Sequence, residues 1–379
     1  MDNSLIGGNS AAEIMPMNAT HTKWQQLSAE LLFGKRAGFR TARWHRSLDE
    51  SAATLAQIPI YQRIVRSRPF QRLKDIRFLG GLDYMFSPSG HLRGRQSRAD
   101  HSEGVALLVL RYCQQVEASE ADMRTLVACA LLHDIGHCPL SHSIEPAFKK
   151  IFGFDHHKVG DQIIQGELDH YDTEVSEILT ECGVDPAKVV SVLAGKGGAT
   201  LHDEIFSHPI NVDTIEGMAR CTAYLNPRAW SWIGNTAKVG MEINETADMF
   251  WRLKDQVYSK LINAPVGVLA DAICDIYVSN NADKFTVADC YATDSVLRAK
   301  HPALFDCLEE SRKLLPKIAL PPSLQVNDCQ LSFRKRTFFT DPIWSQADAR
   351  RYKQSKELST LMLTKANQPQ PELPLPASA

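Results

Sequence analysis

The sequence lacks a disulfide framework and any long apolar run. Its nine cysteines include no CxxC pair and no even, tight spacing, and Cys113, Cys129 and Cys274 lie in apolar helical stretches. This usage predicts reduced core cysteines in a cytoplasmic protein. The longest apolar runs, such as LVACALL, are too short to cross a bilayer, and the N-terminus lacks a basic segment followed by an apolar one. We therefore expect neither a membrane span nor a signal peptide.

The sequence also has no large excess of charge of one sign, and it has few alternating patterns of the kind that predict β-strands. A net charge of −2 and a pI near 6.7 argue against a protein built to bind the nucleic-acid backbone, although they leave room for a local basic groove. With 379 residues, 44% of them apolar, the chain is long enough to bury a sizeable core. Apolar residues recur mainly at helical spacing, which predicts a mainly α fold. The segment LSFRKRTFFTDPIW predicts a small β element near the C-terminus.

Composition divides the chain into three parts. Residues 1–55 form an N-terminal extension that we expect to be partly mobile, and residues 56–345 form one domain. Residues 346–379 are expected to hold a C-terminal helix and the proline-rich tail QPQPELPLPASA. The stretch LAGKGGATLHD only superficially resembles a phosphate loop, because it lacks the G-x-x-x-x-G-K-[ST] spacing, and is predicted to be a connector.

Histidines and aspartates at the ends of two apolar helices form the main motif. His101 opens a helix predicted over 101–116, and the adjacent His133 and Asp134 end a second one predicted over 120–135. Imidazole and carboxylate groups together suit first-row transition metals. Adjacent ligands point about 100° apart on a helix, so other helices must supply partners. His101 and the isolated Asp213 of INVDTIEGMAR are available, and we predict one divalent metal ion at these four residues.

A simpler interpretation of each histidine has to be weighed. A lone His-Asp pair is common, and a histidine on an apolar helix is more often a core or capping residue than a metal ligand. The density of histidines favours a site, because six of the chain's 13 lie between His101 and His157. No structural requirement explains that density, whereas a metal and phosphate site does.

The order of these motifs resembles a known family. The strings SRADHSEGV, ALLHDIGHCPLSH and INVDTIEGMAR resemble the HD-domain metal-dependent phosphohydrolases. The similarity is greatest to the deoxynucleoside-triphosphate triphosphohydrolase (dGTPase-like) branch, since FQRLKDIRFLGGLDYMF, DHHKVGDQII and RKRTFFTDP also match it. The resemblance covers residues 60 to 340. It implies a helical HD fold for the domain at 56–345 and a catalytic metal at the four predicted ligands.

The resemblance also implies roles for the residues that follow the His-Asp pair. His137 and His142 match histidines that contact the reacting phosphate or orient the attacking water, although both can also simply support the metal ligands. His156 matches a histidine proposed as a general acid, which is worth roughly 10²- to 10⁴-fold in rate. Glu145 matches an acidic residue that supports these catalytic histidines.

Basic residues are the candidates for substrate binding. Arg98 occupies a position where the family uses Arg against the nucleotide, and Gln71 and Arg72 match a pair that touches phosphates or an adjacent nucleotide. Lys254 and Tyr258 share one helix face and are predicted to reach phosphates from an opposite wall. The cations of the loop before the first ligand either contact a polyphosphate or remain solvated. They are His91, Arg93, Arg95 and Arg98.

Several positions depart from the triphosphohydrolase pattern. Phe78 replaces a Gln that helps to recognise the sugar. Gly217 replaces a Tyr that packs on the deoxyribose, and Cys221 replaces an Asp. Thr214 stands where a phosphate-binding Lys or Arg is frequent, and Ala99 where an aromatic is usual. The metal-ligand pattern is intact and the sugar-reading pattern is not. These departures support phosphohydrolase chemistry and weaken any inference of deoxyribose selectivity.

Three hypotheses follow. The favoured one is a hydrolase that converts (deoxy)nucleoside triphosphates to nucleoside and triphosphate with one divalent ion, which is Mn, Fe, Ni, Co, Zn or Mg. The second is a phosphomonoesterase or phosphodiesterase acting on another phosphorylated small molecule, and the third is a non-catalytic nucleotide sensor. The resemblance further implies a homo-oligomer. Neither a membrane nor a nucleic-acid partner is indicated.

Overall fold

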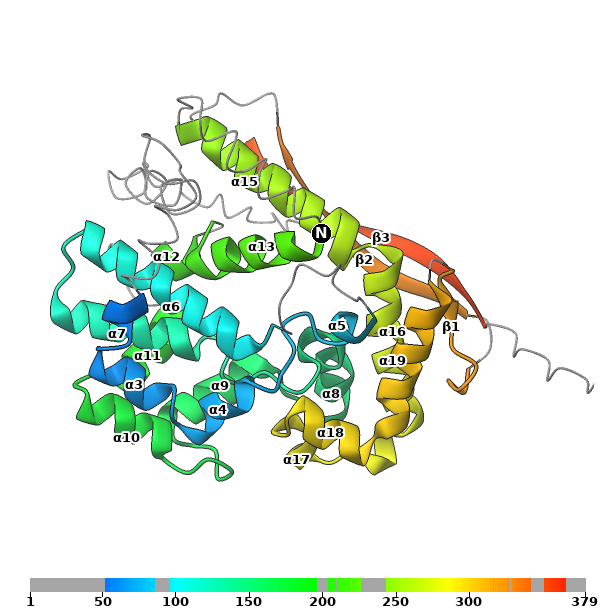
Figure 1. Ribbon diagram of the computed structural model, residues 1–379, viewed down its shortest axis with the longest axis horizontal. Coiled ribbons are helices and arrows are strands. Elements are labelled where there is room, and N and C mark those ends of the chain that lie inside the picture. Colours follow the sequence, from blue (N-terminus) through cyan, green and yellow to red (C-terminus); the bar gives the residue numbers. More distant parts are fainter. Residues whose placement is uncertain are drawn as a thin grey trace, which may run out of the picture.

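A computed structural model describes residues 52–85, 96–195, 204–208, 210–225, 243–315, 317–326, 329–341 and 351–365. Helices make up most of this part of the chain, and a small sheet lies near its C-terminal end (Figure 1). The predicted mainly α class is therefore confirmed. Residues 1–51 of the extension expected over 1–55, the loop cations His91, Arg93 and Arg95, and the proline-rich tail lie outside the described residues.

Two long helices form the centre of the fold, as the sequence predicts. Helix α6 (Arg98–Gln115) begins with a capping box in which Ser97 and Asp100 satisfy each other's backbone N–H groups. Helix α7 (Glu120–Leu132) follows and ends at its C-cap residue, His133. Helix α13 (Val212–Leu225) packs against α6 (Figure 1). The ends of these three helices meet where the predicted metal ligands lie.

The remaining helices surround this centre. The elements that precede α13 in the chain are α3 (Pro59–Ile64), α4 (Arg68–Leu73), α5 (Leu82–Met85), the 3₁₀ turn η1 (Ser141–Ser143), α8 (Glu145–Phe152), α9 (His156–Gln165), α10 (Glu174–Glu181), α11 (Pro186–Leu193) and α12 (Glu204–Ser207). The elements that follow α13 are α15 (Ile243–Val257), the π-helix η2 (Tyr258–Ile262), α16 (Pro265–Asn280), the 3₁₀ turn η3 (Ala282–Lys284), α17 (Val287–Cys290), α18 (Asp294–Lys300) and α19 (Pro302–Leu314).

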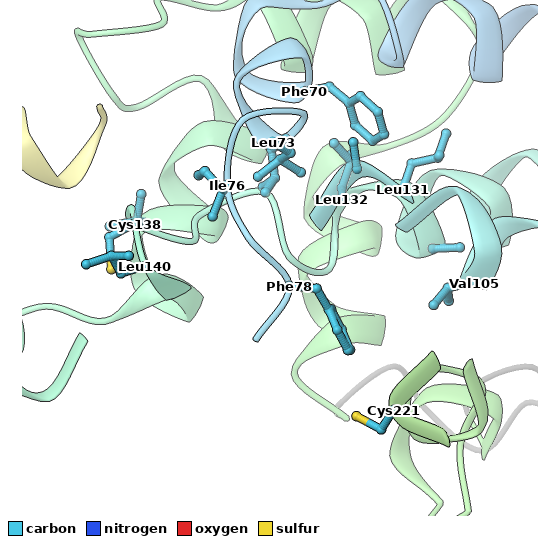
Figure 2. Close-up of a cluster of buried hydrophobic side chains, with 14 of the residues drawn as sticks. Phe70, Leu73, Ile76, Phe78, Val105, Leu131, Leu132, Cys138, Leu140 and Cys221 are labelled. Carbon is cyan, nitrogen blue, oxygen red and sulfur yellow. The ribbon is translucent and has the colours of Figure 1, made fainter. Parts of the chain in front are cut away.

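A continuous apolar core connects the helices to the segments that carry the predicted site. Phe70 and Leu73 of α4 lie near Leu131 and Leu132 of α7, and all four side chains are fully buried (Figure 2). Because buried side chains pack at nearly crystalline density, this core fixes the C-terminal end of α7 firmly. None of the nine cysteines forms a disulfide, as predicted, and seven of them are buried.

The C-terminal sheet contains one correction. The expected helix after residue 346 is wrong, because Tyr352–Lys365 form strand β3. This strand pairs antiparallel with β2 (Cys329–Thr340) from Thr340↔Tyr352 to Cys329↔Leu363, and a short β1 (Ala319–Leu320) runs parallel to β3 on its other side. The long backbone ladder with β2 outweighs the helix-forming lysines and leucines of this segment.

Among the described residues, no single helix is long and apolar enough to cross a membrane. One pair of helical segments, Phe250–Ile262 and Pro265–Asn280, meets the length and composition criteria together, with a bend of 55° between them. Eight residues of α16 are buried in the protein, including Leu269, Ile273 and Cys274.

Candidate metal centre and active site

Four predicted metal ligands converge at the ends of α6, α7 and α13. The Nε2 atom of His101 lies 3.2 Å from Nε2 of His133 and 3.0 Å from Oδ1 of Asp213. Oδ2 of Asp134 lies 3.7 Å from His101 Nε2 and 3.6 Å from His133 Nε2. The predicted grouping of these residues is thus present in the structure, although they span more than 100 residues of sequence.

Hydrogen bonds at the outer ring nitrogens orient both histidines. His133 Nδ1 lies 2.8 Å from the carbonyl oxygen of Ala130, and His101 Nδ1 lies 2.5 Å from Oε2 of Glu216. When Nδ1 donates to an oxygen, the lone pair of Nε2 is left for a metal. Both Nε2 atoms therefore point into the same space with the geometry that a cation needs.

Glu216 is a functional residue that the sequence reasoning did not identify. It stands one helical turn after Asp213 on α13, so both carboxylates face His101. Arg220, a further turn along, donates through Nε to Glu216 Oε2 at 3.1 Å and through its amino group to Asp100 O at 2.8 Å. The spacing Asp213, Glu216, Arg220 at i, i+3 and i+7 was the available signal.

The electrostatics of this group favour a cation. Burial alone would lower the pKa of His101, but the carboxylates of Glu216 and Asp213 outweigh it and raise the pKa to about 9. Burial would raise the pKa of Asp134, but His133 and Arg98 outweigh it and hold that pKa well below its usual range. His101, His133 and Asp134 offer ligand atoms that lie within 4.8 Å of one another, and Asp213 Oδ1 lies 3.0 Å from His101 Nε2. Such imidazole and carboxylate groups suit a divalent transition metal.

A second histidine group lies beside the first. Glu145, the first residue of α8, contacts His142 Nδ1 through Oε2 at 3.0 Å and accepts a hydrogen bond from the backbone N–H of His156 at 2.9 Å. It also pairs with the ring of His156. His137 stacks on His156 with ring centres 4.1 Å apart, and its Nε2 lies 3.3 Å from Asp134 Oδ1. The predicted catalytic residues are therefore joined to the metal-ligand group.

The histidines of this second group differ in how far their side chains are exposed to solvent. The side chain of His142 is 62% exposed, whereas that of His137 is fully buried. Burial lowers the pKa of His137 well below its usual range, and desolvation also lowers the pKa of His142. The fully buried ring of His137 is thus neutral at pH 7, and a neutral ring retains one N–H donor. The pKa of Glu145 is lowered too, because contacts with His142 and His156 outweigh the effect of burial.

A cavity of about 720 Å³ opens over the metal-ligand group. His101 and Asp213 line it from one side, together with Arg98, His142 and Glu145. The other walls come from the rest of α13 and from α15, η2, α16 and β2. They include Thr214, Gly217, Met218, Cys221, Lys254, Tyr258, Asp271, Arg334 and Arg336.

Three of the five predicted substrate-binding residues line this cavity. Arg98 donates to Asp134 at 2.8 Å and to Ser141 at 3.0 Å, and its guanidinium lies over the ring of Phe78. Lys254 lies over the ring of Phe338 at 5.0 Å, and desolvation lowers its pKa to about 8. Tyr258 opens the π-helix η2, a kind of irregularity that is frequent at functional sites.

The other two predicted substrate residues lie outside the cavity lining. The amide of Gln71 donates to the carbonyl of Val65. The guanidinium of Arg72 is buried and donates to the carbonyl oxygens of His137, at 2.6 Å, and Ile135, at 2.8 Å. Arg72 thus holds the turn that follows the His-Asp pair, which is a structural role.

The departures from the triphosphohydrolase pattern have a visible consequence. Phe78 packs against His101, with ring centres 4.9 Å apart, where a Gln was expected to read a sugar. Gly217 lies close to the same two rings, since an added Cβ would be in ordinary contact with Phe78 at 3.7 Å and with His101 at 3.9 Å. Cys221 is buried beside the cavity. This wall offers little hydrogen bonding to a sugar.

Comparisons with known proteins agree with this geometry. The family model for the HD domain matches residues 98–183, which include every predicted metal ligand except Asp213. The uncharacterized protein YwfO of Bacillus subtilis is 32% identical over 167 residues, which are 42% of this chain and 35% of YwfO.

Similarity extends to triphosphohydrolases. The deoxynucleoside triphosphate triphosphohydrolase SAMHD1 homolog of Dictyostelium discoideum is 24% identical over 239 residues, or 58% of this chain and 41% of that protein. Human SAMHD1 is 35% identical over 97 residues, which are 24% of this chain and 15% of human SAMHD1. The matched part of the chain thus spans 35% of the length of YwfO and 41% of that of the Dictyostelium protein. Residues 98–183 of this chain thus form an HD domain.

Proposed function

We propose that this protein is a metal-dependent phosphohydrolase acting on nucleotides, with (deoxy)nucleoside triphosphates as its substrates and nucleoside and triphosphate as products. The observation that carries the proposal is the meeting of two features in one cavity. Two of the four predicted metal ligands, His101 and Asp213, line the cavity, as do the cations Arg98 and Lys254. His133 and Asp134 lie directly behind His101. A phosphate chain needs both features.

The residues divide the chemistry among them. A divalent ion held by His101, His133, Asp134 and Asp213 would lower the pKa of its water and neutralise phosphoryl charge. Of the three predicted catalytic histidines, His142 is the one that lines the cavity, and we assign to it the contact with the reacting phosphate or the leaving oxygen. Glu145 fixes the ring of His142, and the same carboxylate holds His156, the family's general-acid position.

Lys254 provides a pH-dependent test of phosphate binding. Its pKa of about 8 means that the ammonium is charged below pH 8 and loses its proton above it. We expect the KM for a triphosphate to rise as the pH passes 8, and Lys254→Met to raise KM about 10- to 100-fold at pH 7. Lys254→Arg should abolish the alkaline rise, because a guanidinium stays protonated. Steady-state kinetics between pH 6.5 and 9.5 measure both effects.

A lysine outside the cavity provides the matched control. Lys284, the last residue of η3, donates a hydrogen bond from Nζ to Asn281 Oδ1. Lys284→Met should therefore leave KM unchanged at every pH. A KM that stays flat through pH 8 in the wild-type protein, or that is unaffected by Lys254→Met, would remove Lys254 from the substrate site.

One observation favours a second candidate, a phosphomonoesterase or phosphodiesterase acting on another phosphorylated molecule. The wall made by Phe78, Gly217 and Cys221 lacks the groups that read a deoxyribose in the triphosphohydrolase pattern. A panel of ribo- and deoxynucleoside triphosphates, nucleoside monophosphates and phosphodiesters, each with Mn²⁺ and with Mg²⁺, separates the two. Turnover of triphosphates supports the first proposal, and turnover confined to the other esters supports the second. Tight nucleotide binding without any turnover would support a sensor instead. Cytoplasmic location and homo-oligomeric assembly stay predictions.

A further inference from the structure

The short turn just before His142 adopts an unfavourable backbone conformation. Leu140 has φ = 54° and Ser141 has φ = 47°, so two successive L-residues occupy the left-handed region. Such conformations are sterically costly for residues with a Cβ and persist only where the surroundings hold them. Because this turn leads directly into His142, whatever holds it also sets the position of that ring.

A buried carboxylate from a distant part of the chain holds this turn. Asp294, the first residue of α18, is 1% exposed. Its Oδ1 accepts a hydrogen bond from the backbone N–H of Leu140 at 2.8 Å. Its Oδ2 accepts hydrogen bonds from the backbone N–H of Arg77 at 3.1 Å and from the hydroxyl of Tyr84 at 2.9 Å. Asp294 therefore joins the turn to the segment 77–84.

Two further contacts join the same two segments, and a third joins the turn to Arg98 of α6. The hydroxyl of Ser141 donates to the carbonyl of Arg77 at 2.7 Å and accepts from Arg98 Nε at 3.0 Å. Gly80 leaves the space that the carbonyl of Leu140 occupies, since a Cβ at Gly80 would lie 2.0 Å from that oxygen. The Leu140–Ser141 turn is thus held on one side by the segment 77–84, which includes Phe78 of the cavity wall, and on the other by Asp294 of α18.

We propose that Asp294 is a positioning residue for the hydrolytic reaction, because it fixes the Leu140–Ser141 turn and thereby the place of His142 in the cavity. The inference rests on the proposed function of His142. Asp294 does not line the cavity and lies outside the matched HD segment, so it acts through the backbone that it holds and not by contact with the substrate. Its carboxylate is suited to the task because one side chain must accept three hydrogen bonds, and an amide oxygen offers a single acceptor atom.

Asp294→Asn tests the proposal with nearly unchanged volume. We expect kcat to fall about 10- to 100-fold, as when a supporting residue lets a catalytic group shift, while KM and bound metal stay within about threefold. Hydrogen exchange followed by mass spectrometry should show faster exchange in residues 138–144, by about tenfold or more, with α7 unchanged. Tyr84→Phe, which removes one donor to Asp294, should show the same pattern more weakly and serves if Asp294→Asn fails to fold.

Asp289 provides a matched control from the neighbouring helix. It is 4% exposed and accepts hydrogen bonds from the Thr286 N–H and from Lys300, without any contact to the turn. Asp289→Asn should lower Tm but leave kcat within about threefold and the exchange of 138–144 unchanged.

The outcomes are distinct. Normal kcat in Asp294→Asn, unchanged exchange at 138–144, or an equal loss in Asp289→Asn would each overturn the positioning role. Wild-type protein that binds metal but hydrolyses no phosphate ester would instead overturn the proposed function, and the exchange measurement would still decide whether Asp294 holds the turn.

Discussion

His133→Ala and Asp134→Asn are expected to remove both bound metal and turnover. Each variant deletes one of four ligands at a buried site, so metal content should fall below about a tenth of the wild-type value. Turnover should fall by about 10³-fold or more, because a divalent ion contributes several kcal/mol of charge stabilisation and each 1.36 kcal/mol is tenfold in rate. Elemental analysis and steady-state kinetics on the same samples measure both quantities.

A histidine away from the site controls for the loss of any imidazole. His170 is exposed and stacks on Tyr291, so His170→Ala should keep its metal and its rate. Circular dichroism verifies that the ligand variants are folded, since Asp134→Asn also weakens the ion pair with Arg98. Retained turnover in a folded His133→Ala protein without metal would refute the assigned centre.

His142→Asn is expected to have the second largest effect, for a different reason. The ring faces the cavity and is held by Glu145 but is not a predicted metal ligand. We expect kcat to fall about 10²- to 10⁴-fold, the usual range for a proton-transferring group, with metal content unchanged. Single-turnover kinetics at saturating substrate measure the loss directly.

Glu145→Gln allows a more specific comparison. If Glu145 acts by orienting the catalytic histidines, the double variant His142→Asn/Glu145→Gln should be little slower than His142→Asn alone, because residues that act as a unit are not additive. Additive losses would mean that the two residues work independently. A fall in metal content with His142→Asn would move His142 into the metal-ligand group.

The metal centre was predictable from sequence because its signals are local. The apolar run that ends at His133 and Asp134 predicts a buried helix end, and the apolar spacing after His101 predicts a helix that begins there. The partnership of these ends with Asp213 followed from the need for ligands on other helices and from the family resemblance. Both helices occur within a few residues of their predicted bounds.

The remaining features depend on contacts between distant segments. Arg72 was expected at a phosphate, but its guanidinium reaches backbone carbonyls of the turn after the His-Asp pair, which only the packing of α4 against that turn determines. Asp294 contacts Leu140 from 154 residues away. The helix expected after residue 346 is a strand because pairing with β2 decides its conformation, and the sequence pattern alone does not show that partner.

The position of the bond that is cleaved tests the central claim most directly. Purified protein would be incubated with Mn²⁺ and each (deoxy)nucleoside triphosphate in H₂¹⁸O, and the products would be identified by mass spectrometry. The account predicts unlabelled nucleoside and an intact triphosphate that carries one ¹⁸O, because water attacks the α-phosphorus beside the metal ligands. Release of orthophosphate or pyrophosphate, or ¹⁸O in the nucleoside, would contradict it.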